Sequence, residues 1–546
     1  MRNRIIVVCI ALVLTGVWGP SASAGVILPP DGAALNYTHV PFRWEPLGFS
    51  FLPGGGAAYQ LQVVEDNGMA DPFAGQPSAV FLANVDAHEP RIVVRQGLEF
   101  GKSYAWRVRG FEYDPTPWSA TYRFSIPALP AYVPTFSVTE TGAPIQPGIT
   151  MLTIFSQAGQ IPGGQALFVA VDEDGKVIWH LTTGSVFGND LRLLENGRIL
   201  YISSNRGTEG TLAGGIAWQS PADPNQQVHH EIFPMPNGDK LAVLYEFRDV
   251  MVGGMPQSWR GDRIVVYDRH TSDIVWSWST FDYLSTLDFD ATTMTAPDPQ
   301  GKYRWTWTNA GIYNELDNSV YISCRHLNRV VRIDYDTGEI VYNMGFDAAS
   351  GEVDFGDNLF SFQHGLEALP NGNLLVYDNG NRRNHMDQTS ATGMTKVIEL
   401  AFGGGEPPSG ASIVWQYTLP SYNNFVGSNH RQPNGNTVIT AGAAAQVIEV
   451  DATGTEVWRL SRVGGGVPNY GIYRSTRDAS LIVDTPGDTD GDWDLDSRDF
   501  GQWQVCYTGS GPADLDFPCT LCDVDGDDDV DAEDWSRFED ESTGPL

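Results

Sequence analysis

The sequence has few basic residues for its length. Its 546 residues include 33 Lys and Arg against 67 Asp and Glu, which gives a net charge of −34. Nucleic acids and anionic membranes attract positively charged patches, so neither is expected as a partner. A glycine-rich loop of the kind that cradles phosphates is missing as well.

Long apolar runs are also scarce. The run that stands out covers residues 5–17, follows Arg2 and Arg4, and precedes the small residues 22–24. This order is typical of a signal peptide, here residues 1–24, and the run is too short for a comfortable membrane span. We therefore predict an exported protein without a transmembrane segment, located in the periplasm, outside the cell or on the cell surface.

Cysteine is the third shortage. Of five cysteines, Cys9 would leave with the signal peptide, and Cys324, Cys506, Cys519 and Cys522 would remain. An oxidising compartment permits a disulfide bond near the C-terminus, but the sequence leaves the pairing open. Cys324 is predicted to be a small buried side chain.

Aromatic residues, glycine and proline are plentiful, which suits an all-β protein with many turns. Residues 25–130 predict a β-sandwich. Residues 103–108 (SYAWRV) alternate cleanly, and Leu98 lies six residues before Tyr104, as in the tyrosine corner of immunoglobulin-like folds. The segment resembles fibronectin type III domains and contains no residue pattern that suggests catalysis. A proline-rich linker at 127–134 follows it.

Residues 137–484 repeat one pattern. A first hairpin turns at an Asn-Gly or Asp-Asn pair, and a second hairpin ends in an aromatic residue, for example DEDGKVIW and DATGTEVW. Two hairpins give four strands, which is one propeller blade, and six turns predict a six-bladed β-propeller whose N- and C-terminal strands share one blade. The six turns lie at Asn196-Gly197, Asn237-Gly238, Asp317-Asn318, Asn371-Gly372, Asn434-Gly435 and, more weakly, Arg477-Asp478.

The last segment, residues 485–546, predicts a small helical, calcium-binding tail. Aspartates fill positions 1, 3, 5, 7, 9 and 12 of two loops, and Ca²⁺ prefers such closely spaced oxygens. The pair resembles a dockerin module or tandem EF-hand-like loops, which implies a protein partner; a merely acidic tail is the alternative. Position 6 is Trp493 in one loop and Asp528 in the other instead of glycine, so lowered affinity is expected. The predicted ligands are Asp488, Asp490, Asp492, Asp494, Asp496 and Asp499, then Asp523, Asp525, Asp527, Asp529, Asp531 and Asp534.

Four histidines stand near the predicted starts of the repeated hairpins: His230, His326, His364 and His430. First strands of propeller blades line the central channel, so these side chains are predicted to converge there. Such a cluster suits metal binding or nucleophilic and acid–base catalysis. A structural role in each hairpin is the alternative, favoured for His430 because it lies closer to its turn. His229 is predicted to point into its own sheet.

Four stretches carry a family resemblance: VHHEIFPMPNG, YISCRHLNRVVRIDYDTGEIVY, FSFQHGLEALPNGNLLVYDNG and QPNGNTVIT. They resemble the bacterial arylsulfotransferases, exported six-bladed propellers that move a sulfuryl group from an aryl sulfate to a phenol by a ping-pong route. The resemblance implies that His364 becomes the sulfohistidine. It implies that His230 and His326, with Arg325 beside it, contact the sulfuryl oxygens or the departing phenolate, that Asn309 matches a family site residue, and that no catalytic cofactor is needed.

The chain departs from that family at two places. Trp307 and Asn343 stand where the family tends to have a histidine and an arginine, and Arg325, Arg382 or Arg383 are candidates to replace the lost charge. A non-catalytic propeller that binds a ligand or partner is therefore kept as the main alternative. A quinone-dependent oxidoreductase is a weaker one, because vicinal cysteines and a recognisable repeated tryptophan pattern are missing.

Overall fold

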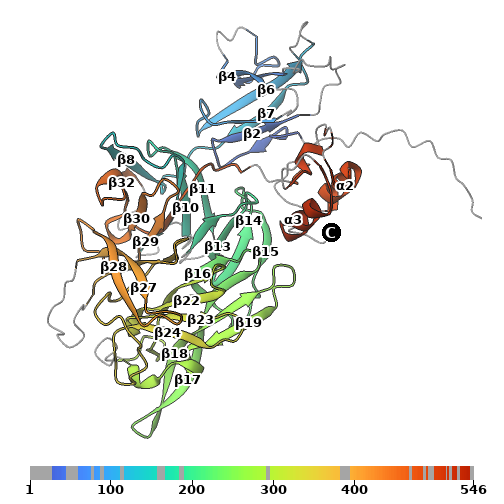
Figure 1. Cartoon of the computed structure of the whole chain (residues 1–546). Coiled ribbons are helices and arrows are strands. Elements are labelled where there is room, and N and C mark those ends of the chain that lie inside the picture. The colour runs from blue at the N-terminus through green and yellow to red at the C-terminus, as the bar shows by residue number, and fades with distance from the viewer. Residues whose placement is uncertain are drawn as a thin grey trace, which may run out of the picture.

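Strands make up most of the computed structural model of the chain (Figure 1). The structure describes residues 27–44, 59–74, 79–85, 91–110, 116–156, 166–183, 190–289, 296–381, 394–465, 470–483, 487–489, 497–511, 513, 515, 519–524 and 529–541. The predicted signal peptide, residues 1–24, and Arg382 and Arg383 lie outside these ranges. Among the helices in these ranges, none is both long and apolar enough to cross a membrane.

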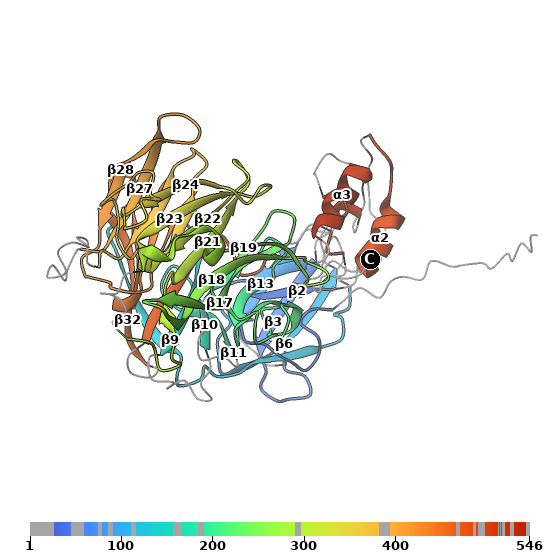
Figure 2. The same ribbon diagram turned by 90° about the horizontal axis from the view of Figure 1, so that it is seen from below.

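Six antiparallel sheets follow one another around the main body (Figures 1 and 2). Four of them are built from four or five strands in chain order, and their strands have the following bounds. They are β12 (Leu191–Leu193), β13 (Ile199–Ser203), β14 (Arg206–Gly210) and β15 (Ile216–Gln219); β16 (Val228–Pro234), β17 (Lys240–Val252), β18 (Met255–Tyr267) and β19 (Ile274–Ser279), with β20 (Tyr303–Arg304) beside β18; β21 (Thr308–Asn314), β22 (Ser319–Cys324), β23 (Arg329–Asp334) and β24 (Ile340–Gly345); and β25 (Leu366–Ala368), β26 (Leu374–Asp378), β27 (Lys396–Gly403) and β28 (Gly410–Thr418).

The other two sheets join distant parts of the chain. In one, β33 (Tyr470–Asp478) pairs with β9 (Ile149–Ser156), which continues to β10 (Ala166–Val171) and β11 (Val177–Thr183). In the other, β8 (Pro134–Glu140) pairs with β32 (Glu456–Gly465), after β29 (Ser428–Arg431), β30 (Thr437–Ala441) and β31 (Gln446–Val450). Both ends of this region are thus held by strand pairing. Short helices α1 (Thr280–Tyr283), η1 (Thr286–Asp288), η2 (Arg325–Leu327) and η3 (Gly442–Ala444) lie between strands.

The Asn-Gly pairs form the first turn of their sheets, as their sequence predicts. Gly197, Gly238, Gly372 and Gly435 have φ between +75° and +87°, a range that glycine adopts without steric cost. In each turn the preceding asparagine side chain accepts a hydrogen bond from the backbone N–H two residues later. The first strands then meet one another, since β16 contacts β21, β21 contacts β25, β25 contacts β29, and β29 contacts β33.

Tryptophans of the fourth strands connect neighbouring sheets, a repeated contact that the sequence pattern did not reveal. Each indole N–H donates to a backbone carbonyl in the next sheet along. The pairs are Trp179 with Leu212 (2.8 Å), Trp276 with Tyr335 (2.8 Å), Trp415 with Ala452 (3.0 Å) and Trp458 with Glu173 (3.0 Å). The last pair links the final sheet to the sheet that contains β9 and β33.

The N-terminal part forms two small sheets that lie against the main body. They contain β1 (Ala33–Ala34), β3 (Tyr59–Glu65), β4 (Phe81–Val85), β6 (Lys102–Gly110) and β7 (Tyr122–Ile126) on one side, and β2 (Val40–Arg43) and β5 (Arg91–Val94) on the other. The Tyr104 hydroxyl accepts a hydrogen bond from the Glu99 N–H (2.8 Å).

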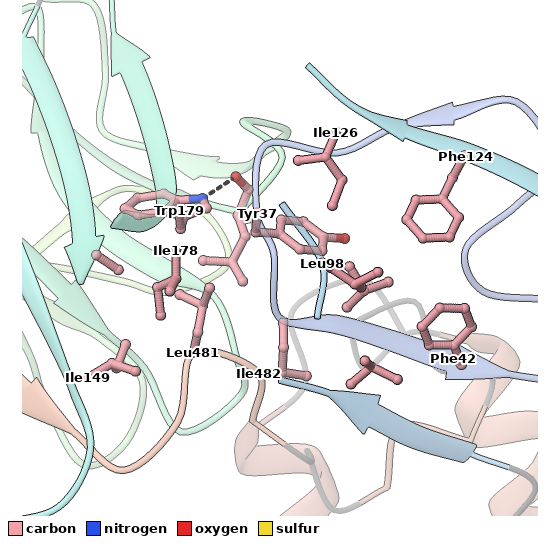
Figure 3. Close-up of a cluster of buried hydrophobic side chains, with 14 of the residues drawn as sticks. Tyr37, Phe42, Leu98, Phe124, Ile126, Ile149, Ile178, Trp179, Leu481 and Ile482 are labelled. Atoms are coloured by element: carbon pink, nitrogen blue, oxygen red, sulfur yellow. Dashed lines mark hydrogen bonds between the residues drawn. The ribbon is translucent and has the colours of Figure 1, made fainter. Parts of the chain in front are cut away.

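One hydrophobic core joins this part to the first sheet of the main body (Figure 3). Tyr37 and Leu98 from the N-terminal part pack in the same cluster as Ile178, Trp179 and Ile149. A bridge between Tyr37 and Trp179 adds backbone contact. Apolar packing therefore holds the two parts together, in addition to the proline-rich linker that connects them.

The C-terminal part contains α2 (Ser497–Cys506), η4 (Cys519–Leu521) and α3 (Ala532–Glu541). A disulfide between Cys506 and Cys519 joins α2 to η4. Cys522 and Cys324 are buried thiols. Helices α2 and α3 lie beside the N-terminal sheets (Figures 1 and 2), where Arg43 donates to the Thr489 carbonyl.

Candidate active site

Three of the predicted histidines lie at one end of the first strands. His230 is in β16 and His364 comes two residues before β25. The prediction that His326 also begins a repeated hairpin is wrong, because it lies in η2 between the second and third strands of its sheet. In an antiparallel sheet the second strand ends where the first begins, so His326 still lies at the same end of the sheets as the other two.

His364 is held so that one ring nitrogen is committed to the protein. Its Nδ1 lies 2.8 Å from the Gly427 carbonyl, and since a carbonyl only accepts, Nδ1 carries the proton. The backbone of His364 is held as well, because its N–H donates to the Tyr377 carbonyl (2.8 Å). No described residue forms a hydrogen bond with Nε2, which leaves its lone pair for a substrate.

The surroundings of His364 keep it neutral. The side chain is buried, and this burial, followed by the charge of Arg474, lowers the pKa of His364 to about 3. Arg325 acts in the same direction, whereas the hydrogen bond to Gly427 and the charge of Asp190 oppose it. A neutral imidazole with a fixed tautomer is the form that acts as a nucleophile.

Aromatic rings connect the three histidines. The ring of Tyr473 lies 5.2 Å from that of His364 and 6.3 Å from that of His230. Trp307 lies 5.5 Å from His230 and is stacked on His326 at 5.3 Å. Trp307 therefore separates His230 from His326 at the place where the resembling family tends to have a further histidine.

His326 repeats the arrangement of His364. Its Nδ1 lies 3.3 Å from the Arg304 carbonyl, and burial followed by the charge of Arg325 lowers the pKa of His326 to about 3. At neutral pH it is therefore an uncharged ring. The positive charge near Trp307 comes instead from Arg260 and Arg304, whose guanidinium groups lie 4.8 and 4.6 Å from its ring centre.

Arg325 and Asn309 contact different parts of the site. The Arg325 guanidinium lies 4.7 Å from the ring of Phe362 and donates to the Asn424 carbonyl (3.2 Å). Asn309 is fully buried, and its amide donates to the Gln363 carbonyl (2.9 Å), next to His364. Asn309 thus holds the backbone that carries His364, and contact of either residue with a substrate remains a prediction.

Four residues near the site were not predicted as site residues: Tyr473, Arg474, Asp262 and His229, which was expected to point into its own sheet and contacts Asp262 and Tyr245 there. Arg474 forms ion pairs with Glu231 (2.5 Å) and Asp190 (3.2 Å), and Arg192 pairs with the same two carboxylates. Tyr473 and Arg474 come from β33, whose sequence has only a weak turn signal. Asn343 stands where the resembling family tends to have an arginine. It lies in β24, the fourth strand of its sheet, and not in a first strand.

A cavity of about 760 Å³ adjoins this site. Its lining includes Arg192, Gly365, His430 and Arg474, which come from the first strands of several sheets. His430 lies here and not with the other three histidines. Arg474 borders both places, because it lines the cavity and also lowers the pKa of His364.

Carboxylates that could hold a metal ion lie close together in the C-terminal part of the described chain. Within the described ranges, one group of three candidate ligand atoms lies within 4.8 Å, from Asp529, Asp531 and Asp534, and the site histidines form no such group. Asp499 and Asp534, at position 12 of the two predicted loops, each accept a hydrogen bond from the position 2 N–H, at 2.7 and 2.6 Å. These residues fit a pair of calcium loops in register. Asp488 and Asp523 are described, whereas Asp490, Asp492, Asp494, Asp496, Asp525 and Asp527 lie outside the described residues.

The chain was compared with solved structures, with curated proteins and with models of protein families. Solved structures that match the chain include a protein of unknown function from Bacteroides caccae, a streptogramin B lyase, and a virginiamycin B lyase from Staphylococcus aureus with quinupristin. The Bacteroides protein is 12% identical, and the match covers 60% of this chain and 98% of that one, with a TM-score of 0.38. The streptogramin B lyase is 16% identical, with 62% and 90% covered and a TM-score of 0.32. The virginiamycin B lyase is 12% identical, with 60% and 100% covered and a TM-score of 0.32. Likenesses this distant do not bear on the reaction. No curated protein matches the chain. The arylsulfotransferase (ASST) family model matches residues 150–474, which is more than half of the sequence, and the chain therefore belongs to that family.

Proposed function

We propose that this protein transfers a sulfuryl group from an aryl sulfate to a phenolic acceptor, with His364 as the nucleophile and a sulfohistidine as the intermediate. The observation that carries the proposal is the 2.8 Å contact between Nδ1 of His364 and the Gly427 carbonyl. This contact leaves Nε2 unprotonated, and no described residue is bonded to it. The site also contains three further histidines, His229, His230 and His326.

The remaining groups suit the charge that develops during sulfuryl transfer. When the S–O bond of an aryl sulfate breaks, negative charge builds on the leaving oxygen and on the sulfuryl oxygens. Arg325 and Arg474 are close enough to His364 to lower its pKa, and positive charge at that range also stabilises the anionic group being transferred. His230 and His326 are proposed to contact the sulfuryl oxygens or the leaving phenolate.

The architecture is proposed to be a six-bladed propeller preceded by a fibronectin type III-like sandwich. Six sheets support the propeller: four have their strands in chain order, and the other two combine β33 with β9 and β8 with β32. The Tyr104 hydroxyl, bonded to the backbone N–H of Glu99, supports the sandwich. Export is also proposed, since residues 1–24 have the order of a signal peptide and the Cys506–Cys519 disulfide suits an oxidising compartment.

The C-terminal part is proposed to bind Ca²⁺ and to dock the enzyme to a protein partner, as in a dockerin-like module. The carboxylates of Asp529, Asp531 and Asp534 would supply the hard oxygen ligands that Ca²⁺ requires. The ion would order the loops and the helices attached to them, and it would take no part in sulfuryl transfer.

The test is a release assay on the purified mature chain with 4-nitrophenyl sulfate and an excess of phenol. Wild type should release 4-nitrophenol in a phenol-dependent manner, His364→Ala should not, and His270→Ala, at an exposed turn, should behave as wild type. Intact-mass spectrometry after donor alone should detect a sulfuryl adduct on wild type and not on His364→Ala. Equal activity of His364→Ala and wild type would contradict the nucleophile assignment.

The alternative is a propeller that binds its ligand without turnover. Binding of an aryl sulfate by the folded wild type, with neither phenol release nor an adduct, would favour that function. Such a result would also make Trp307 a candidate cause of the lost activity. The resembling family tends to have a histidine at this position, and an indole ring, unlike an imidazole, cannot exchange a proton.

A further inference from the structure

His229 and His230 are adjacent in sequence but contact each other. The register of β16 against β17 shows that residues 229–231 of β16 face one residue of β17, and His230 has φ +61°. On a regular strand, consecutive side chains point to opposite faces; a bulge removes this alternation. As a result the two Nδ1 atoms lie 2.6 Å apart.

His229 also lies against a buried carboxylate. Its Nε2 is 3.2 Å from Oδ1 of Asp262, and its ring is stacked on Tyr245 with centroids 3.8 Å apart. The other carboxylate oxygen accepts hydrogen bonds from the Thr306 hydroxyl (2.5 Å) and the Thr308 N–H (2.6 Å). Burial would raise the pKa of Asp262, but hydrogen bonds from His229, Thr306 and Thr308 hold it below its usual value, so the carboxylate stays charged.

These contacts determine where protons sit. Nε2 of His229 lies at ion-pair distance from the Asp262 carboxylate, 3.2 Å, and a neighbouring carboxylate favours a proton on that nitrogen. In the 2.6 Å contact between the two Nδ1 atoms, one donates and the other accepts. If the pair is neutral, Nδ1 of His230 donates and its Nε2 has a free lone pair. If the pair holds one more proton, His229 is an imidazolium between Asp262 and His230, and Nε2 of His230 becomes a donor.

The groups that face His230 from other strands are cationic or neutral. Burial is the main cause that lowers the pKa of His230 well below its ordinary value, and the charges of Arg474 and Arg260 act in the same direction. Tyr473 contributes its hydroxyl, which donates to the His230 carbonyl (3.2 Å). His230 is therefore a poor place for a resident positive charge, whereas His229 has the Asp262 carboxylate beside it.

We propose, on the basis of the function proposed above, that Asp262 and His229 are positioning residues that make His230 a reversible proton shuttle. In the acceptor half-reaction the phenol O–H gives its proton to Nε2 of His230, and Nδ1 of His230 passes its proton to His229. The phenol oxygen bonds to sulfur while the S–N bond to His364 breaks, and that electron pair returns to Nε2 of His364.

The donor half-reaction returns the same proton. Nε2 of His364 bonds to the sulfur of the next aryl sulfate, the S–O bond breaks, and its electron pair leaves on the phenolate oxygen. That oxygen takes the proton from Nε2 of His230, whose Nδ1 regains one from His229. Over a full cycle the protein gains and loses no proton, and no external acid or base is consumed.

The experiment compares kcat/KM for two donors, since this ratio reports the donor half-reaction alone. 4-Nitrophenyl sulfate has a leaving group that needs no proton, whereas phenyl sulfate does. Asp262→Asn should lower kcat/KM by about 100-fold for phenyl sulfate and by less than about tenfold for 4-nitrophenyl sulfate. Asp273→Asn, at an exposed turn, is the matched control and should leave both values unchanged.

The pH profile gives a second readout that a purely structural role would not change. Because Asp262→Asn removes the carboxylate beside His229, the pH profile of kcat/KM for phenyl sulfate should differ from that of wild type, whereas the profile of Asp273→Asn should not. His229→Phe is a second variant, because it keeps a ring stacked on Tyr245 and removes both nitrogen contacts.

Equal losses for the two donors, or no loss in correctly folded variants, would overturn the shuttle while the transferase function stands. If wild type transfers from neither donor, the proposed function fails and the shuttle fails with it. That outcome is recognisable because it does not depend on Asp262. Near-UV circular dichroism of each variant checks folding independently of turnover.

Discussion

Nδ1 of His364 and Nδ1 of His326 each lie near a backbone carbonyl, at 2.8 and 3.3 Å. Each ring therefore has a fixed tautomer, and burial keeps each one uncharged near neutral pH. A buried neutral imidazole can act as a nucleophile. It also makes the folded protein sensitive to acid, because below the ordinary histidine pKa the unfolded chain binds a proton at this side chain and the folded chain does not.

We expect the free energy of unfolding to fall as the pH decreases from about 6.5 towards 3. Burial lowers the pKa of both His364 and His326 to about 3 in the folded state, so between these pH values the unfolded state binds more protons. Each histidine contributes up to about 1.4 kcal/mol per pH unit. Urea unfolding of His326→Gln at several pH values should show a smaller slope than wild type, and His270→Gln should not; an unchanged slope would contradict the pKa of His326.

The sequence pattern pointed to His230 and His364 but did not place the residues that contact them. His364 and His230 stand at fixed distances from Asn-Gly turns, so the repeat revealed them. Tyr473 and Arg474 come from a strand more than 100 residues after His364, and a pairing at that separation leaves no local pattern. The contact between His229 and His230 depends on a bulge, which a rule of strict alternation excludes.

At the scale of elements, the loop before β29 matters most for the site. Gly427 has φ +107°, and its carbonyl fixes the tautomer of His364. A Cβ at this position would lie 2.3 Å from the Tyr377 ring. The glycine is thus required both by its backbone conformation and by the close approach of an aromatic side chain.

Gly427→Ala should destabilise the protein by about 1–3 kcal/mol and reduce sulfuryl transfer, because relief of the clash moves the carbonyl away from His364. Gly372→Ala is the control: its φ is +82° and no atom lies within 4 Å of an added Cβ, so it has a backbone cost of about 1 kcal/mol. Urea unfolding and the release assay would be measured on both. Equal activity of the two variants would show that the carbonyl of Gly427 is dispensable.

Element boundaries followed the sequence most closely at the turns. Each Asn-Gly pair sits between the first and second strands because glycine with positive φ and an asparagine oxygen satisfy a two-residue turn locally. His326 was misplaced because RHLN also forms a tight connection, closed by Asn328 with φ +48°, and the motif alone does not tell a first strand from a second.

At the scale of the whole molecule, the indole contacts between sheets hold successive sheets together. Trp458→Phe should lower the free energy of unfolding by about 1–3 kcal/mol, because the indole of this buried residue donates to the half-buried Glu173 carbonyl, which then loses its donor. Trp415→Phe, at a half-buried position, should cost less, about 0.5–1 kcal/mol. Chemical unfolding monitored by circular dichroism measures both; a larger effect of Trp415→Phe would contradict this account.

Removal of Ca²⁺ should affect the C-terminal part alone. With a chelator we expect loss of helical signal and a lower melting temperature for this part, while sulfuryl transfer is unchanged. Calorimetric titration with Ca²⁺ should show weaker binding for Asp534→Asn, and Glu533→Gln, which is exposed and adjacent, should bind as wild type does. Identical binding by Asp534→Asn and wild type would exclude this carboxylate as a ligand.

The core shared by the N-terminal sheets and the first sheet of the main body has a consequence for a chain that emerges from the ribosome N-terminus first. Strands β9–β11 are made long before β33, the strand that completes their sheet. Tyr37 and Leu98, which are made earlier still, pack in one core with Ile149 and Ile178. We therefore expect the N-terminal part to shield the apolar side chains of the unfinished sheet during synthesis, until its last strand is made.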